Sequence, residues 1–454
     1  MRLRSILLIG LLIRLAISPF LAHPFDVYRF YFNGENFAAG TVPVSFYLVP
    51  YRFSFFLFAF PATLLFNFIS GQFGSFSIPL SALDPRLIPG PPFSISLIPG
   101  PLFDLLVKLP LILSDLLVAI VLFRLVLRYA HNEAFALSAT TAWLLNPFTI
   151  WVSSAWGMWD TLPALFALVA LYLALDNKFF YAALALIVSI ALKLYAGVLL
   201  PPLFVLAWRS TDRKAMIKVA ASFAIAGLSI FALSPVSIVE QLNTTLTESP
   251  VTWLSFSGLS IWSSATLFSG FNPITASLVL LGGGFLVIYA WMWTKRFTGG
   301  FVKAVSHFCI PIAFLLLFFR FIGENFVVWL LPFTAILSSE DARTRQLYWI
   351  ISGIALLSSV TNTLLPYYFL PVAPSFQGAL VGFLSAAAPY RAAPGGLIPS
   401  GLTFGKAYLS ALGVLMFMGL LMLLSRWLPM NKRGLLVIGN KLVWFANRAQ
   451  RALR

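Results

Sequence analysis

Residues 104–128 read DLLVKLPLILSDLLVAIVLFRLVLR, and this stretch decides the fold class of the chain. A helix needs about 20 mostly apolar residues to cross a hydrocarbon core of about 30 Å, and this stretch is long enough. Similar apolar runs recur along the 454 residues, of which 60% are hydrophobic and only 10% charged. Soluble domains carry roughly 25% charged residues. We therefore predict an all-α polytopic membrane protein.

The length criterion predicts about 12 membrane-spanning helices. The candidate spans are 5–22, 104–128, 134–153, 160–176, 179–195, 196–208, 215–234, 271–293, 303–320, 325–338, 346–369 and 405–428. Lys193 to Gly197, followed by Pro201, predicts a broken helix pair, which is tolerated at this depth only against protein or a cavity. We assign residues 1–430 to one membrane domain and 431–454 to a basic amphipathic tail at the inner surface.

The distribution of charge predicts which ends of the helices face inward. The 30 Lys and Arg residues give a formal charge of +16, but they lie singly or in pairs between apolar spans. This spacing follows the positive-inside rule and argues against a nucleic-acid partner. Both termini then lie inside, and residues 23–103 form a long first outer loop. The run 53–68 keeps this pattern only as a re-entrant or interfacial helix, broken near Pro61.

Two aspartates are the leading site candidates, because both are predicted on the outer face. Asp26 follows the first helix, and Asp160 stands at the start of a later one. Partial desolvation would raise the pKa of Asp26 and make it a better base. The alternatives are a solvated or helix-capping Asp26 and an N-cap Asp160.

Other ionisable residues lie within or beside the predicted spans. Asp115 and Lys193 are intramembrane, so each indicates either a site or a structural ion pair. Arg29, Arg52 and Arg320 form a possible outer cluster for a lipid phosphate, since a guanidinium binds two phosphate oxygens at once.

The sequence contains no recognisable cofactor motif, and we expect none. With three histidines and one cysteine, a divalent metal is conceivable but not expected. His23 and Asp26 offer two ligands, and no third or fourth is evident.

Several ordered segments resemble one enzyme class. They are Asp26-Val27-Tyr28 through Glu35 to Gly40, Lys108 with Asp115, Asn146-Pro147 with Gly157 and Asp160, Lys193 with Tyr195, and Glu324 through Trp329 to Pro332. Together they are similar to the GT-C class of polytopic glycosyltransferases. The nearest resemblance is to the catalytic subunit of GPI mannosyltransferase I and to prokaryotic mannosyltransferases that use polyprenyl-phosphate-mannose.

This resemblance implies an inverting glycosyltransferase, with Asp26 as catalytic base and Asp160 as a supporting acid. Its partners would be a polyprenyl- or dolichyl-phosphate sugar donor, with mannose as the expected sugar, a lipid-linked or cell-surface glycan acceptor and membrane lipids. A small partner subunit is left open. The substrate-binding residues would be Arg29, Glu35, Arg52, Trp156, Trp159, Lys193, Tyr195, Arg320 and Glu324, with Asp115 as a structural polar residue. The site would face outward from a prokaryotic plasma membrane, archaeal membranes included, with the endoplasmic reticulum as the alternative.

Three positions depart from the family pattern, and they bear on the sugar, the acceptor and any metal dependence but not on the class. Pro24 stands where an acidic residue is common, Ala196 replaces a proline after Tyr195, and Glu324-Asn325 replaces a Gln-Tyr pair. The rival functions are a secondary transporter and a non-catalytic membrane scaffold that keeps the enzyme fold.

Overall fold

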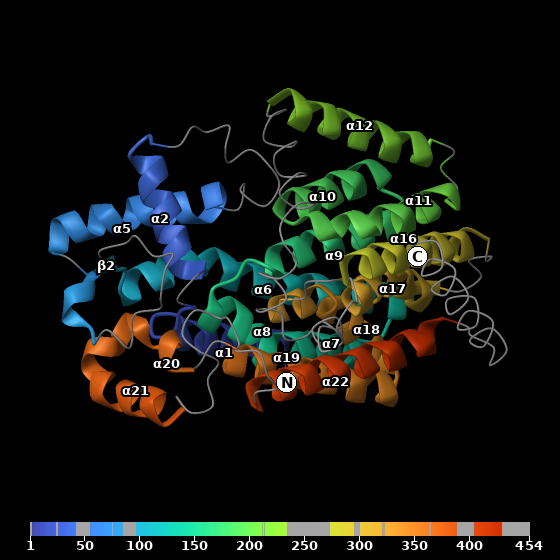
Figure 1. The fold of residues 1–454 in the computed structure, drawn as a ribbon. Helices are drawn as coiled ribbons and strands as arrows, with labels where there is room; N and C mark the ends of the chain where they lie inside the picture. Colours follow the sequence, from blue (N-terminus) through green and yellow to red (C-terminus); the bar gives the residue numbers. More distant parts are fainter. Residues whose placement is uncertain are drawn as a thin grey trace, which may run out of the picture.

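The computed structural model of this chain is built almost entirely of helices (Figure 1). The residues that it describes are 2–23, 26–41, 55–74, 76–84, 97–210, 212, 214–233, 273–294, 300–319, 323–362, 365–387 and 404–428. Strands β1 (Ile78–Pro79) and β2 (Leu97–Ile98) form one short antiparallel pair, with Ile78 opposite Ile98. The all-α class predicted from composition is confirmed.

The first part of the chain contributes the helices that later frame the polar clusters. They are α1 (Leu3–Ile17), α2 (Asp26–Ala38), the π-helix η1 (Phe55–Ala59), α5 (Phe60–Phe73), the 3₁₀ helix η2 (Leu80–Ala82), α6 (Pro101–Ala130), α7 (Glu133–Leu144), α8 (Pro147–Ile150), the π-helix η4 (Trp151–Trp156) and α9 (Thr161–Leu175). α6 includes the 25-residue stretch quoted above and begins with a proline, whose fixed φ suits the first helical turn.

The rest of the chain continues in the same way. Its elements are α10 (Phe179–Leu192), the 3₁₀ helix η5 (Leu194–Leu199), α11 (Leu200–Trp208), α12 (Ala215–Leu233), α16 (Pro273–Thr294), α17 (Gly300–Phe318), the 3₁₀ helix η6 (Glu324–Trp329), α18 (Leu331–Glu340), α19 (Ala342–Asn362), α20 (Leu365–Tyr368), the 3₁₀ helix η7 (Leu370–Val372), α21 (Ala373–Ala387) and α22 (Phe404–Trp427).

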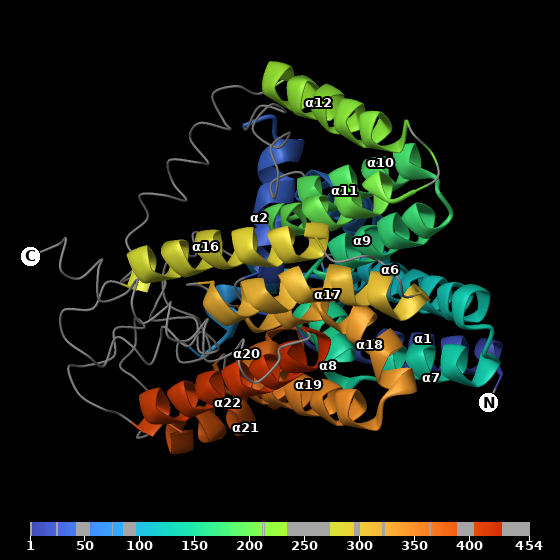
Figure 2. The same ribbon diagram turned by 90° about the vertical axis from the view of Figure 1, so that its right-hand side faces the viewer.

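Most of the long helices run roughly side by side, which Figure 2 shows for α12, α16, α17 and α22. One end of this bundle carries the N-terminus and the turns α6–α7, α9–α10 and α18–α19; we call it the inner end. Exposed basic residues gather in or beside these segments: Arg2, Arg4, Arg124, Arg128, Lys178, Arg343 and Arg345. The opposite end, where α2 begins and α10 stops, is the outer end. Asp26 and Asp160 both lie there.

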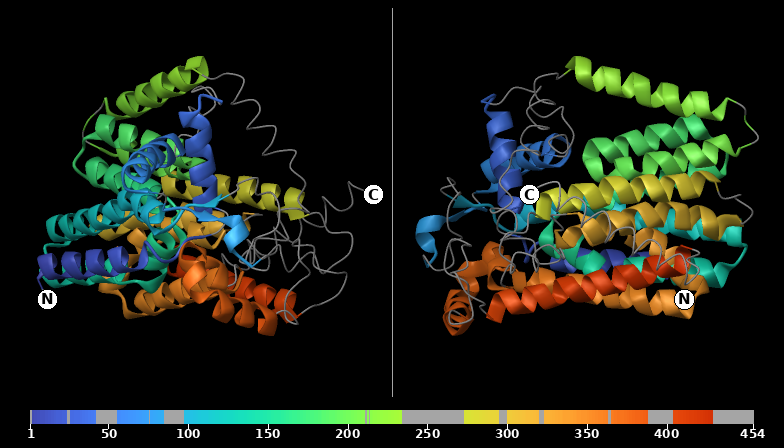
Figure 3. Two further views of the ribbon diagram at one scale, coloured as in Figure 1. Left: turned by 90° about the vertical axis from the view of Figure 1, so that its left-hand side faces the viewer. Right: turned by 45° about the vertical axis from the view of Figure 1, so that its right-hand side comes forward.

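Helices α2 and α5 lie across the direction of the bundle. α2 stands upright in Figure 2, and α5 is seen from the side in Figure 1 but nearly end-on in the left view of Figure 3, where α16 is seen from the side. The two helices approach closely at Gly34, because a Cβ there would lie 2.0 Å from the Thr63 hydroxyl oxygen. α5 exposes apolar side chains such as Phe68 and carries no charged residue, which suits an interfacial helix.

The expected count of about 12 spans is not confirmed. Within the described part of the chain, only α6 and α17 are long and apolar enough to meet a strict spanning criterion. The reason is that several expected spans are divided into shorter pieces. The segment predicted at 134–153 breaks at Leu145, because the Asn146 side chain accepts a hydrogen bond from the Phe148 N–H and starts a new helix at Pro147. The predicted basic tail, 431–454, lies outside the described residues.

Candidate functional site at the outer end

The outer end is built around interruptions in three helical segments. η4 ends at Gly157, whose φ of 85° is left-handed, and α9 starts just after Asp160. α10 ends before Lys193, which is extended (φ −152°, ψ 124°), so the predicted break in this segment is present. η6 begins at Glu324, after an extended Gly323. Each interruption leaves backbone groups without helical partners and turns a polar side chain towards the bundle interior.

Asp160 is the centre of the first polar cluster. Its Oδ1 accepts hydrogen bonds from Lys193 Nζ at 2.7 Å and from Trp329 Nε1 at 2.6 Å. Its Oδ2 accepts from Asn325 Nδ2 at 2.6 Å. The carboxylate is fully buried, and it makes no capping bond to α9. Asp160 therefore joins three separate helix interruptions, and its oxygens are committed to neighbouring side chains.

Aromatic rings enclose the cation of this cluster. Lys193 Nζ lies 5.2 Å from the centre of the Trp159 ring, 5.1 Å from Phe326 and 5.7 Å from Trp329. Tyr195 stacks on Trp329 with 3.2 Å between ring centres. An ammonium gains from the negative faces of aromatic rings, most of all when water is excluded. Lys193 is thus stabilised where it stands and is turned away from solvent.

Asp26 belongs to a second cluster, which reaches the surface. Its Oδ2 accepts a hydrogen bond from Trp156 Nε1 at 2.6 Å and lies 2.9 Å from His23 Nδ1. The His23 and Trp156 rings stack at 4.9 Å, and Tyr368 meets His23 edge-on at 5.5 Å. The Asp26 side chain is 28% exposed, so this is the more accessible of the two carboxylates.

The pKa of Asp26 moves in the direction opposite to the prediction. Burial alone would raise the pKa of this carboxyl, but His23, the Trp156 hydrogen bond and the charge of Lys193 together outweigh burial and hold the pKa below its usual value. Groups that bind the charged form favour it. A carboxylate with a lowered pKa is a weak base near neutral pH. The expectation that desolvation raises the pKa of Asp26 is therefore wrong.

Gly157 connects the first loop to the main bundle. A Cβ at this position would lie 2.8 Å from Val27 Cγ2 and 2.9 Å from Lys108 Cε, so α2 and α6 meet at the bare glycine. Lys108 Nζ in turn donates hydrogen bonds to the carbonyl oxygens of Ser18, at 2.9 Å, and Leu21. These carbonyls follow the end of α1, so Lys108 holds the chain that leads to His23 and Asp26.

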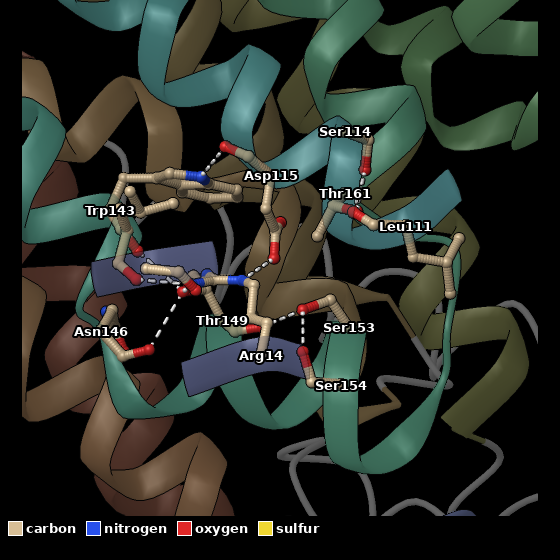
Figure 4. Close-up of polar contacts among 12 residues, drawn as sticks. Arg14, Leu111, Ser114, Asp115, Trp143, Asn146, Thr149, Ser153, Ser154 and Thr161 are labelled. Atoms are coloured by element: carbon tan, nitrogen blue, oxygen red, sulfur yellow. Dashed lines mark hydrogen bonds and ion pairs between the residues drawn. The ribbon is translucent and has the colours of Figure 1, made fainter. Parts of the chain in front are cut away.

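A third polar cluster lies deeper in the bundle and is built on Arg14 (Figure 4). Arg14 Nε pairs with Asp115 Oδ2 at 2.6 Å, and both side chains are fully buried. Arg14 Nη1 also donates to the Leu144 carbonyl at 2.7 Å, and Trp143 Nε1 donates to the Asp115 carbonyl at 3.1 Å. Asp115 therefore lies in an ion pair that ties α1, α6 and α7 together.

The other predicted site residues are dispersed. Arg29 is exposed on α2. Glu35 lies further along the same helix and accepts a hydrogen bond from Asn67 of α5 at 2.7 Å, away from the clusters. Glu324 is buried and accepts from Ser358 at 3.0 Å. Arg52 and Arg320 lie outside the described residues, so the cluster of Arg29, Arg52 and Arg320 stays a prediction.

Sequence reasoning missed several members of these clusters. Asn325 and Trp329 lay in a quoted motif but were given no role, although a buried carboxylate predicts nearby donors. Arg14, the partner of Asp115, was not among the predicted site residues. Among the described residues, no group of at least three His, Cys, Asp or Glu side chains is arranged to hold a metal ion.

The fold is mostly helical and, within the described residues, includes two helices long and apolar enough to cross a membrane, and the buried charges at its outer end are bound mainly to one another. A family model described as GPI transamidase subunit PIG-U matches residues 84–281, which is less than half of the 454-residue chain. The chain is therefore similar to that family over α6 to α12 and part of α16. Among curated proteins, no significant match was found.

This match corrects the expected function. The matched family is a transamidase subunit, so the assignment to the mannosyltransferases is wrong, together with the glycosyltransferase activity, the polyprenyl-phosphate-sugar donor and the glycan acceptor that it implied. A prokaryotic plasma membrane is likewise not supported. The reason for the error is physical: Lys108, Asn146, Gly157 and Lys193 stabilise helix ends and helix contacts, and such features report a fold and not an activity.

Proposed function

We propose that this chain is a non-catalytic membrane subunit of a GPI-transamidase assembly. A transamidase forms a new amide on an amine acceptor, here the glycolipid glycosylphosphatidylinositol, and the similarity over residues 84–281 supports a role beside that reaction. The partners would then be other protein subunits and not a sugar-donor lipid. The same proposal favours the endoplasmic reticulum membrane, the alternative location.

The geometry of the outer end supports a structural role for its acids. Asp160 is fully buried, and both of its oxygens accept hydrogen bonds from neighbouring side chains, three in all, so the carboxylate is turned away from solvent. Asp26 is bound by Trp156 and His23 and has a lowered pKa. General-base catalysis needs a group that accepts a proton readily near the working pH, and the lowered pKa of Asp26 disfavours that role.

This single observation carries the proposal: the charges that resemble a catalytic set instead fasten helix interruptions to one another. A subunit of a multi-protein enzyme benefits from a rigid outer end, because partner surfaces must keep their shape. The non-catalytic scaffold considered above is therefore the function that we retain.

The test is to delete the gene for this chain in the cells that express it and to measure the surface level of a GPI-anchored reporter. We expect the reporter to lose its anchor and the unattached glycolipid to accumulate, while an affinity-tagged copy of the chain recovers further protein subunits from mild detergent. A tagged copy that carries Asp26→Asn should restore anchoring of the reporter in cells that lack the original chain. Normal anchoring in cells without the chain would refute the proposal.

A further inference from the structure

The inner end carries a basic cluster that the proposed function does not use. Arg124 and Arg128 lie one helical turn apart at the end of α6, and Lys178 lies in the turn between α9 and α10. All three side chains are exposed. The acid among them is Asp176, whose side chain is only 4% exposed. The surface of this cluster is therefore strongly cationic.

Asp176 orders these cations. Its Oδ1 lies 2.9 Å from Arg128 Nη2 and also accepts a hydrogen bond from the Tyr129 hydroxyl. Its Oδ2 lies 3.7 Å from Lys178 Nζ. A buried carboxylate that fixes two exposed cations leaves their outer faces preorganised, which lowers the entropy lost when a ligand binds.

Two tyrosines further restrict the guanidinium. The Arg128 Cζ atom lies 5.7 Å from the centre of the Tyr129 ring and 5.8 Å from that of Tyr172. Arg128 Nη1 also donates to the Tyr172 hydroxyl at 3.3 Å. Yet the Arg128 side chain stays 54% exposed and that of Lys178 58% exposed. The cations are held in place without being covered.

Apolar side chains beside this cluster indicate the kind of ligand. Phe180 and Tyr181 directly follow Lys178 and are 45% and 60% exposed. Leu127, next to Arg128, and Leu184, one turn after Phe180, are also exposed. Aromatic rings of this kind mark the height of lipid headgroups, with aliphatic side chains below them in the hydrocarbon. Cations therefore meet apolar contacts at one membrane surface.

We propose that Arg124, Arg128 and Lys178, ordered by Asp176, bind the phosphate of an anionic phospholipid headgroup in the leaflet at the inner end. A guanidinium binds phosphate oxygens in a fork, and basic residues at helix ends attract anionic lipids at the cytoplasmic surface. The acyl chains would lie along the apolar side chains beside Phe180. This site is independent of the proposed function.

The test compares two variants that each lose two exposed cations from the inner end. Purified full-length chain is reconstituted in vesicles of equimolar phosphatidylcholine and phosphatidylinositol, then extracted, and the retained lipids are measured by native mass spectrometry. We expect wild type to enrich phosphatidylinositol over phosphatidylcholine. In Arg128→Gln/Lys178→Gln this enrichment should be about tenfold lower. The control Arg343→Gln/Arg345→Gln should change the enrichment less than about twofold, because those residues lie in α19 and the proposed site lies on α6 and the α9–α10 turn.

Two further arms keep the proposal open to refutation. Arg124→Gln/Lys178→Gln leaves the Arg128–Tyr172 contact intact, so it replaces the first variant if that protein unfolds. Inorganic phosphate is added as a competitor, and it should displace the lipid poorly. Equal losses in test and control variants, no enrichment in wild type, or complete displacement by inorganic phosphate would overturn the lipid assignment.

Discussion

The two ends of the bundle use charge in different ways. At the outer end Asp160 and Lys193 are buried and paired with each other, whereas at the inner end Arg128 and Lys178 are more than half exposed. A buried ion must be paired because desolvation of an isolated charge is costly, but an exposed one keeps its water. The outer charges therefore fasten helices to one another, and the inner charges remain available to the membrane surface.

The largest expected effect concerns the assignment of the two ends to opposite sides of the membrane. The chain has a single cysteine, Cys309, which is fully buried, so a Cys309→Ala background is suitable for labelling. Arg29→Cys and Arg343→Cys, at exposed positions, should react with a membrane-impermeant maleimide from opposite compartments of sealed vesicles. Labelling of both cysteines from the same compartment would show that the two ends do not lie on opposite sides of the membrane.

The next effect concerns the deepest paired charges. Arg14→Met should lower the free energy of unfolding by about 3–5 kcal/mol, because Asp115 would remain buried without its partner. The double variant Arg14→Met/Asp115→Leu should be less destabilised than the single one. Denaturation in detergent measures both, and Arg4→Gln, an exposed position on the same helix, should stay within about 0.5 kcal/mol of wild type. A double variant that is worse than Arg14→Met would show that the pair itself is favourable.

A smaller effect tests how tightly the outer end is packed. Gly157→Ala should cost about 1–3 kcal/mol, since the residue has φ 85° and its new Cβ would press on Val27 and Lys108. Gly353→Ala is the matched control, because no atom outside its own helix lies within 4 Å of its added Cβ and the substitution improves helix propensity. Thermal unfolding of the two variants provides the comparison. Equal melting temperatures would mean that Val27 and Lys108 move aside at little cost in stability.

The smallest effect is a pH dependence at Asp26. Its pKa in the folded protein lies below its ordinary value, so its stabilising contribution is present above about pH 4 and is lost as the pH falls through the folded pKa. The melting temperature of Asp26→Asn should therefore lie below that of wild type near neutral pH, and the difference should shrink in acid. A difference that grows as the pH falls would indicate a raised pKa.

Only part of the outer end was predictable. The break after α10 follows from Lys193 and the two prolines beyond it, and the grouping of Asp26 with Asp160 at one end follows from the order of apolar runs and basic residues. The partners of Asp160 were not predictable, since Asn325 and Trp329 are more than 160 residues away along the chain. The lowered pKa of Asp26 was only partly predictable, because His23 is three residues away but Trp156 and Lys193 come from distant segments.

The sequence by itself determined that this chain is mostly helical and predicted a membrane protein with basic residues at its inner end, because hydrophobic length and charge are local properties of the chain. Only the tertiary structure decided what each charge does. Buried charges join neighbouring helices, as Asp160, Asp115 and Arg14 do, and Arg128 is an ordered surface cation. Each has these roles because its partner comes from another segment. Pairing and exposure are set by packing, and packing depends on contacts that no local pattern records.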